Sequence, residues 1–563
     1  MTRKQTHSAS RATASFRLKS AFLSLAVVVA TPAFADGWVD NVNGITLDAQ
    51  GKVIRFSGLT VTPEGRVGKL VQRGDKAPER PDWRLDGKGQ TLLPGMIDGH
   101  VHIMDLGFST LTVNLSDTVS LDQAKAKIAA YAAAHPDRHW ILGGGWNEEK
   151  WRLGRLPTAA DLAGLAGDRP IWLMRADSHS GLANAAAMTA AGVTAATKTP
   201  AGGRIEVVAG KPTGVFVDSA RSLITKAIPA PTSKDRDLAF SKAQDIFLGF
   251  GITGVADMGT SVDDWNAFRR AGDSGRLAVR IYSYALGIEP TLTIAAGEPT
   301  PWLYAEHLRM GGVKFFADGA LGSRGACLKK PYADKPAESG LCFMDDARMK
   351  NLMSRAAMDG FQVAVHAIGD RANDEVLSSI EDLAPTYKGD RRWRIEHAQI
   401  VDPVDLPRFG KNGIVGSMQP VHQTSDRTMA EARLGADRLA GAYAWKSMLN
   451  NGAHLAFGSD TPVESSNPFP GIAAAISREG ADGQPFGGWQ PQEIITREQA
   501  LAGFTTGAAY AEFAEDRFGR LAPGYRADFI LVDHDPMEGP PSAVRATTVN
   551  ETWIGGKRVF RKK

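Results

Sequence analysis

Cysteine is nearly absent from this chain of 563 residues, which carries only Cys327 and Cys342. No Cys-x-x-Cys or Cys-x-x-His pattern surrounds either residue, so the pair is not part of a metal-ligand motif. In an oxidising compartment the two thiols could form a disulfide that closes a loop of about 15 residues. Two unpaired thiols are the alternative.

Long apolar runs are also missing, since none approaches the roughly 18–20 residues that a membrane helix needs. This absence excludes a membrane-spanning body and stable membrane insertion. The chain shows no basic stripe and no interleaving of basic and aromatic residues, so a nucleic-acid partner is not expected. With 43% hydrophobic and 23% charged residues, the composition is ordinary for a soluble globular enzyme. A small molecule is the expected partner, and the sequence leaves open whether the chain is a monomer or a homo-oligomer.

Acidic residues are absent from the first 35 positions, where the chain differs from the rest. A basic segment precedes the apolar stretch 21–30, and Ala33-Phe34-Ala35 follows as a small-x-small cleavage pattern. These features predict a signal peptide over residues 1–35 and secretion by the general route, to the periplasm. A short buried helix or an uncleaved anchor is the alternative. Removing the five positive charges of this leader changes the formal charge from +3 to −2.

Both ends of the remaining chain are predicted to form short β segments separated by turns that contain glycine. Residues 36–90 and 515–563 are therefore expected to pair into one small β-sandwich domain, because exposed strand edges must be paired or covered. The predicted strands are Gly44–Leu47, Val53–Phe56, Leu59–Thr62, Gly68–Val71, Asp528–Val532, Thr547–Trp553 and Lys557–Phe560.

Between these ends, residues 91–514 alternate apolar β runs with helical segments, which indicates a parallel sheet covered on both faces. Two of the ten runs, Trp140–Gly143 and Ile171–Arg175, fall in the long stretch 108–241. We assign that stretch to an insertion, or lid subdomain, between barrel strands 1 and 2. The other eight runs then predict an α/β fold, a (β/α)8 TIM-type barrel: Leu92–Asp98, Ile252–Asp257, Val279–Tyr284, Gly312–Asp318, Gln362–His366, Trp393–His397, Ile414–Gln419 and His454–Asp460.

Most of these runs end in a polar residue, which is where such a barrel carries its chemistry. His100 and His102 follow the first run, and residues two apart on a strand point to one face, so their imidazoles are suited to chelate zinc. His366, His397 and Asp460 end three later runs. Each alone could be a satisfied buried polar residue, but their repetition at equivalent strand ends predicts one metal centre.

Lys314 lies inside an apolar strand, where a charged ammonium is costly. Burial is expected to lower its pKa and favour the neutral amine. A neutral amine can add carbon dioxide to become a carbamate, whose two oxygens are able to bridge two metal ions. The alternative is an ammonium paired with Asp318 or another carboxylate.

Longer segments around these residues carry a family resemblance. They are Val313–Arg324 (VKFFADGALGSR), Val365–Asn373 (VHAIGDRAN), Arg394–Gln399 (RIEHAQ), Met418–Asp426 (MQPVHQTSD), Gly458–Val463 (GSDTPV) and Gly519–Asp528 (GRLAPGYRAD). Through them the chain resembles the amidohydrolase superfamily over nearly its whole mature length, in the branch that includes N-substituted formamide deformylases. All six ligand positions that the resemblance implies are filled. It is specific for the fold and the metal chemistry, and weakly specific for the substrate.

The resemblance implies a divalent metal, zinc by expectation, with two ions favoured over one. The implied arrangement is one ion on His100, His102 and Asp460, the second on His366 and His397, and a carbamate on Lys314 between them. The implied reaction is attack of a metal-bound hydroxide on the substrate. Asp460 is the implied catalytic residue, which moves the proton to the leaving nitrogen.

The predicted activity is hydrolysis of a non-peptide C–N bond, in an amide, N-acyl or N-formyl group. A metal-dependent dipeptidase, or an esterase or lactonase, would use the same site. A non-catalytic metal-binding protein would be expected to have lost a ligand, and none is missing. An arginine that binds a carboxylate would favour N-acyl amino acids or dipeptides, whereas a neutral aromatic pocket would favour formamides or esters. The predicted substrate contacts are Trp146, Asp177, His179, Arg324, Gln419 and His422.

Overall fold

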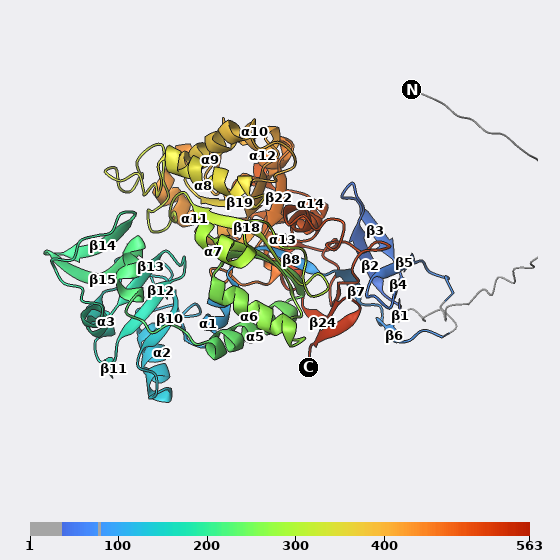
Figure 1. The fold of residues 1–563 in the computed structure, drawn as a ribbon, viewed down its shortest axis with the longest axis horizontal. Coiled ribbons are helices and arrows are strands. Elements are labelled where there is room, and N and C mark those ends of the chain that lie inside the picture. Colours follow the sequence, from blue (N-terminus) through green and yellow to red (C-terminus); the bar gives the residue numbers. More distant parts are fainter. Residues whose placement is uncertain (1–36, 77–79) are drawn as a thin grey trace, which may run out of the picture.

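The computed structural model describes residues 37–76 and 80–563, so the predicted signal peptide lies outside the described residues. Figure 1 shows an elongated molecule with the barrel in the middle, the β domain of the two termini at one end and the insertion at the other. Within the described part of the chain, no helix has both the length and the apolar character needed to cross a membrane.

Eight parallel strands form the central sheet, which confirms the predicted barrel. In sheet order they are β8 (Met96–Val101), β16 (Ile252–Thr260), β17 (Arg280–Leu286), β18 (Leu308–Phe316), β19 (Gln362–Ala367), β20 (Arg394–His397), β21 (Val415–Met418) and β22 (His454–Phe457). The first and last strands meet where Val101 bridges Thr461 and the backbone N–H of Asp460 donates to His100. This contact closes the barrel at the edge where the strands end.

Helices cover the outside of the barrel, and their starts are encoded locally. Helix α5 (Ser233–Gly249) and helix α6 (Val262–Asp273) each begin at a capping box, in which Thr232 or Ser261 exchanges hydrogen bonds with an aspartate three residues on. Helices α8 (Asp346–Met358) and α9 (Asp370–Leu383) follow the same strand-then-helix order around β19.

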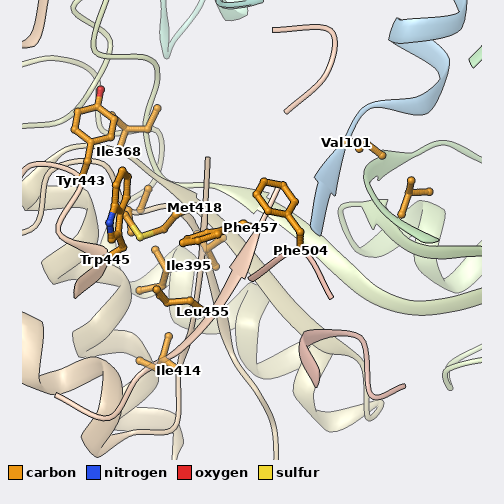
Figure 2. Packing of buried hydrophobic residues seen from close by; sticks show 14 of the residues in the cluster. Val101, Ile368, Ile395, Ile414, Met418, Tyr443, Trp445, Leu455, Phe457 and Phe504 are labelled. Carbon is orange, nitrogen blue, oxygen red and sulfur yellow. The ribbon is translucent and has the colours of Figure 1, made fainter. Parts of the chain in front are cut away.

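Packing follows the two-residue period of the strands. Leu455 and Phe457 of β22 share one hydrophobic cluster with Trp445 and Phe504, whereas Ala456 between them packs in another. Figure 2 shows Phe457 between these aromatic side chains, with ring centroids 6.2 Å from Trp445 and 5.7 Å from Phe504. On β22 the large side chains therefore lie on the face that packs against the outer helices, and Ala456 lies on the opposite face.

The two termini form one sandwich of two sheets, as predicted. One sheet has the order β25-β24-β23-β7-β2-β3 and combines both ends of the chain, and the other has the order β5-β4-β1-β6. Val39, Leu59, Phe529 and Trp553 fill the space between the sheets. The strands are β1 (Gly37–Asp40), β2 (Asn43–Leu47), β3 (Val53–Phe56), β4 (Gly58–Val61), β5 (Val67–Val71), β6 (Arg84–Asp86), β7 (Thr91–Pro94), β23 (Phe529–Val532), β24 (Val549–Ile554) and β25 (Lys557–Arg561).

The predicted strand Leu92–Asp98 is wrong as one element. The chain leaves β7 in the sandwich at Pro94 and enters β8 in the barrel at Met96, with Gly95 alone between them. A Cβ on Gly95 would overlap the side chain of Thr253, so the crossing needs glycine. The predicted strand His454–Asp460 is too long, because β22 ends at Phe457.

The insertion between β8 and β16 has its own sheet, in the order β14-β15-β13-β12-β10-β9. Its strands are β9 (Val113–Asn114), β10 (Ile141–Trp146), β12 (Ile171–Arg175), β13 (Ser180–Ala183), β14 (Gly203–Val208) and β15 (Lys211–Asp218). Helix α2 (Leu121–Ala134) packs on it through Ala124, Ile128 and Ala132. The domain boundaries given by the sequence stay predictions.

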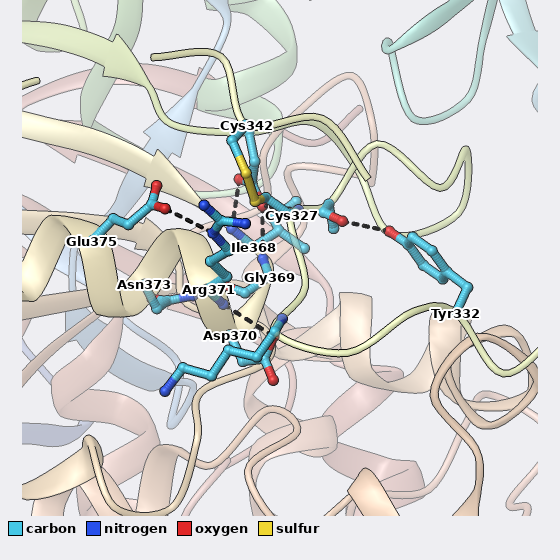
Figure 3. Close-up of a disulfide and its surroundings, with 12 residues drawn as sticks. Cys327, Tyr332, Cys342, Ile368, Gly369, Asp370, Arg371, Asn373 and Glu375 are labelled. Atoms are coloured by element: carbon cyan, nitrogen blue, oxygen red, sulfur yellow. Dashed lines mark hydrogen bonds and ion pairs between the residues drawn. A yellow bond between two sulfur atoms is a disulfide. The ribbon is translucent and has the colours of Figure 1, made fainter. Parts of the chain in front are cut away.

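A disulfide joins Cys327 to Cys342 in the long segment after β18. Figure 3 shows it beside the start of α9, where the backbone N–H of Arg371 donates to the carbonyl of Cys327 over 3.2 Å. The neighbouring backbone N–H of Phe343 donates to Ala317, just past the end of β18. The disulfide and this bond hold the segment against the mouth of the barrel.

Candidate metal centre

Asp460 lies within a group of histidines at the carboxyl ends of the barrel strands. Its Oδ1 is 3.2 Å from Nε2 of His102 and 3.4 Å from Nε2 of His100. Its Oδ2 is 3.9 Å from Nδ1 of His397 and 3.9 Å from Nε2 of His422. The carboxylate of Asp460 thus faces histidines that lie on or next to three different strands, β8, β20 and β21.

The other predicted ligands reach the same place. The ring of His366 is 4.6 Å from that of His397, between centroids. Nζ of Lys314 lies 5.0 Å from the ring of Phe316, whose centroid is 5.2 Å from that of His366. The structure therefore brings together all six residues that the sequence nominated as ligands.

Unusual backbone geometry aims two of these side chains. His397 has a φ of 72° and Asp460 a φ of 58°, in the left-handed region that residues other than glycine rarely adopt. Such strain persists where the surrounding structure enforces it, and it clusters at functional sites. His397 is the last residue of β20 and Asp460 follows the end of β22, so at both positions the turn directs the side chain into the mouth.

Buried partners fix the orientation of the rings. Nδ1 of His100 is 2.7 Å from Oε2 of Glu396, and Nδ1 of His397 is 2.9 Å from Oε1 of Gln419. Metal-binding histidines characteristically hold their second ring nitrogen in this way. Glu396 was not among the predicted site residues, although an acidic residue inside a buried strand beside a nominated ligand indicates such a role.

Several atoms of the cluster are buried without a hydrogen bond to any described residue: Nε2 of His100, His366 and His422, and Oδ1 of Asp460. Burial lowers the pKa of His100, His366 and His397, which favours the neutral, metal-binding form of each ring. Nitrogen and carboxylate donors of this kind suit zinc and related divalent ions. These residues fit a metal ion.

The ligand atoms form two groups of three, and within each group the atoms all lie within 4.8 Å of one another. One is His100, His102 and Asp460, as the resemblance implied; the other is His397, His422 and Asp460. The second group contains His422 where the resemblance implied His366. The Nε2 atom of His366 instead faces Oδ1 of Asp318 at 3.6 Å.

Lys314 is fully buried, and burial lowers its pKa to about 8, although Glu396 and Asp460 act in the opposite direction. The alternative ion pair with Asp318 is not observed. Asp318 accepts hydrogen bonds from three backbone N–H groups instead, those of Cys327 (2.8 Å), Ile368 (2.9 Å) and Gly369 (2.8 Å).

The histidines around Asp460 favour the ionised form of its carboxylate. Burial alone raises its pKa, but His100, His102 and His422 outweigh burial and bring the pKa well below its usual range. The carboxylate is therefore ionised at neutral pH, as a metal ligand must be.

Three of the predicted substrate contacts reach the cluster: Gln419 and His422, described above, and His179, whose ring is 5.3 Å from that of His366. His179 is oriented by Asp218, with Nδ1 2.7 Å from Oδ1.

The other three do not reach the cluster. Trp146 is buried in the core of the insertion and donates to the carbonyl of Leu173. Arg324 is paired with Asp334 at 2.7 Å. Asp177 is paired with Arg175, also at 2.7 Å. Trp146 was predicted from the glycines that precede it, and Arg324 from its place after a barrel strand. The side chain of Trp146 points into the core of the insertion, and that of Arg324 points to Asp334.

Known proteins resemble this chain over most of its length. It is 35% identical to Protein LONG AFTER FAR-RED 3 of Arabidopsis thaliana, over 84% of this chain and 83% of that protein. It is 33% identical to the putative amidohydrolase YtcJ of Bacillus subtilis, over 86% and 92%. It is 28% identical to the N-substituted formamide deformylase of Arthrobacter pascens, over 92% and 97%.

Solved structures agree with these relatives. An uncharacterised metal-dependent hydrolase from Pyrococcus horikoshii superposes with a TM-score of 0.73 at 25% identity, covering 90% of this chain and 99% of that one. A second, from Pyrococcus furiosus, gives a TM-score of 0.69 at 28% identity, covering 90% and 100%. The family model described as the amidohydrolase family matches residues 85–560, which include every barrel strand and the whole histidine cluster. This chain belongs to the amidohydrolase family.

Proposed function

We propose that this protein hydrolyses a non-peptide C–N bond of a small molecule, in an amide, N-acyl or N-formyl group. The observation that carries the proposal is the convergence of histidines and one ionised aspartate at the barrel mouth, with several of their buried atoms making no hydrogen bond to a described residue. The Arthrobacter relative is named for hydrolysis of a formamide, a bond of this class, and it supports the proposal.

The proposed centre holds two zinc ions. His100, His102 and Asp460 would bind one, and His366 and His397 the other. Ions bound there would supply a nucleophile from water near neutral pH and polarise the bond to be cleaved. The neutral histidines and their buried partners Glu396 and Gln419 keep the ligand atoms in place before any substrate arrives.

Lys314 is proposed to carry a carbamate. Its lowered pKa leaves about a tenth of the amine neutral at pH 7. That amine adds to the carbon of carbon dioxide and releases one proton, which gives an anion in place of a cation. A second anion beside Asp460 would balance the charge of two divalent ions, which the ammonium form cannot do.

Asp460 is proposed to move the proton. It is ionised, and its Oδ1 is buried without a hydrogen bond to the described residues, so it can accept a proton when water attacks the substrate. The same oxygen can return the proton to the leaving nitrogen, which must be protonated before the C–N bond breaks.

His422 is proposed to contact the substrate rather than a metal. The amide nitrogen of Gln399 lies 3.2 Å from Nδ1 of His422, and Tyr443 lies within hydrogen-bond distance of the amide oxygen of Gln399. In this arrangement Nδ1 accepts, so the ring carries a proton on Nε2. That N–H is directed into the cluster, where it can bind a substrate oxygen.

Export to the periplasm is part of the proposal. It rests on the basic, apolar and small-residue order of positions 1–35. The disulfide between Cys327 and Cys342 supports it, because disulfides form and persist in oxidising compartments.

The test is an activity screen of the zinc-reconstituted protein against formamides, N-acyl amino acids, dipeptides and esters, with and without chelator. We expect turnover of at least one amide or formamide, lost with chelator and restored by zinc. Turnover confined to dipeptides or to esters would reject the proposed bond. Turnover unaffected by chelator would reject the metal-dependent mechanism.

A further inference from the structure

A cavity of about 540 Å³ opens beside the metal centre, within the size range of small-molecule sites. The insertion contributes Arg221 and His179 to its wall, and the barrel side contributes Phe316, Phe343 and Arg348. None of these residues except His179 was predicted to bind substrate.

The cavity lies close to the centre, although none of the six nominated ligands lines it. The rings of His179 and Phe316, which line it, lie 5.3 Å and 5.2 Å from the ring of His366. A molecule in the cavity is therefore separated from His366 by the thickness of one side chain, and the rest of it contacts the cavity wall.

The guanidinium of Arg221 is held in a fixed orientation in the cavity wall. Its Nε donates to the carbonyl of Asp218 over 3.0 Å, and its Nη1 donates to the carbonyl of Ser178 over 2.6 Å. Both acceptors are neutral carbonyl groups, and Nη2 of Arg221 makes no hydrogen bond to a described residue. No described carboxylate lies within ion-pair distance of this guanidinium. Burial lowers the pKa of Arg221, and the more distant carboxylates of Asp218, Asp177 and Asp105 do not offset this. The guanidinium is thus fixed in place and makes no ion pair with a described residue.

Arg348 brings a second cation to the same cavity, from α8. It too makes no ion pair with the described part of the chain, and it is exposed. The one acidic side chain in the wall, Asp218, is already engaged by His179 through Oδ1. Its Oδ2 faces Gly319 and Gly325 of the barrel segment, where added Cβ atoms would lie 2.9 Å and 3.0 Å from it.

Phe316 and Phe343 supply the apolar part of the wall, and neither is fully buried. Phe343 is adjacent to Cys342, so the disulfide and the bond from Phe343 to Ala317 hold this aromatic ring in place. A ligand that suits the cavity has an anionic group for the two arginines and an apolar body for the two phenylalanines.

We propose that the substrate is an amide that carries a carboxylate and an apolar side group, as an N-acylated apolar amino acid does, and that Arg221 and Arg348 determine this preference. The inference rests on the proposed function for the bond that is cleaved. A guanidinium binds a carboxylate by charge-assisted hydrogen bonds, which favours the anion over a neutral analogue of equal shape.

The test compares N-acetylphenylalanine with N-acetylphenethylamine, which has the same amide and ring but no carboxylate. We expect kcat/KM of the zinc-loaded protein to favour the acid by about tenfold or more. Arg221→Met and Arg348→Met should each reduce that ratio about tenfold, with the neutral amide affected less than about threefold. Lys350→Met removes one charge from the same helix, where the lysine is paired with Asp346 and Asp382, and should leave the ratio unchanged.

A ratio that is unchanged in both arginine variants, or a wild-type preference for the neutral amide, would overturn the inference and leave the proposed function standing. Binding of 3-phenylpropionate and 3-phenylpropionamide, measured by calorimetry, separates the two ideas. If neither amide is cleaved but Arg221→Met weakens binding of the acid alone, the anion site stands and the proposed bond fails. Should Arg221→Met not fold, the exposed Arg348→Met carries the same comparison.

Discussion

The Nδ1 atom of His100 lies 2.7 Å from Oε2 of Glu396, and both side chains are fully buried. Glu396 also receives two hydrogen bonds from Arg394, which in turn donates to the carbonyl of Gly99. This chain of contacts connects β20 to β8 across the barrel interior. It fixes which nitrogen of His100 is free to bind a metal.

Glu396→Gln should therefore weaken metal binding about 10- to 100-fold, because the ring of His100 loses its charged partner. Competition with a chromophoric chelator measures the affinity, and circular dichroism checks the fold. Glu375→Gln, at a surface pair with Arg371, is the matched control. Equal affinities in Glu396→Gln and the wild type would show that Glu396 does not support the metal.

Asp460→Asn should keep the fold and most of the metal but reduce kcat by about 10²- to 10⁴-fold, because an amide cannot accept the proton that water releases. Metal content by mass spectrometry and turnover of a formamide are the measurements. Asp437→Asn, at an exposed aspartate, is the control. Near-normal turnover in Asp460→Asn would exclude the proposed proton transfer.

Lys314→Ala should lower the number of zinc ions bound per chain, since the bridging carbamate is lost. Added formate or acetate should restore part of the metal and of the activity, because a small carboxylate can occupy the space that the side chain leaves. Lys411→Ala, at an exposed lysine, should do neither. Unchanged metal content in Lys314→Ala would contradict the carbamate.

His422→Gln separates a substrate contact from a ligand. If Nε2 donates to the substrate, kcat/KM should fall about tenfold or more while the zinc content stays at the wild-type value. His397→Gln is the comparison and should lose zinc. Loss of zinc from His422→Gln would instead assign it to the group with His397 and Asp460.

Glu512 predicts a pH dependence of stability. Burial raises its pKa to about 8, against about 4.3 in an unfolded chain. Between these values the folded protein holds a proton that the unfolded chain releases, so the contribution of Glu512 to the free energy of unfolding falls as pH rises. Glu512→Gln should gain stability relative to the wild type over this range and no more above about pH 8.

Urea unfolding of both proteins at about pH 5, 7 and 9 measures this difference. Glu298→Gln, at an exposed glutamate, is the control for the loss of one carboxylate. A difference between Glu512→Gln and the wild type that does not change with pH would refute the prediction.

The barrel and its ligands were predictable because each strand is a short apolar run with a polar residue where it ends, as at His366 and His397. That pattern involves only neighbouring residues, so it can be recognised in the sequence without knowledge of the fold. The break at Gly95 was not predictable, because the apolar run continues across it and only the two partner sheets reveal the change.

The cavity shows what local patterns cannot supply. Arg221 and Arg348 are separated by more than a hundred residues, and no periodicity marks either. Arg324 was the more conspicuous arginine in the sequence, but Asp334 neutralises it. Whether an arginine lacks a counter-charge depends on which carboxylates the fold brings near, and that information is tertiary.

Gly95 has a consequence for how the molecule can be divided. One residue separates β7, which pairs with the C-terminal strand β23, from β8, which leads to His100 and His102. The sandwich therefore helps to fix the position of the first ligand strand and is not an independent domain attached to the barrel. Removing the last 35 residues, which contain β23, would leave β7 without one of its paired strands. The start of β8 would then be less well fixed, and with it the positions of His100 and His102. The insertion joins the barrel after those histidines, so changes in the insertion that spare His179 and Arg221 should leave this ligand strand in place.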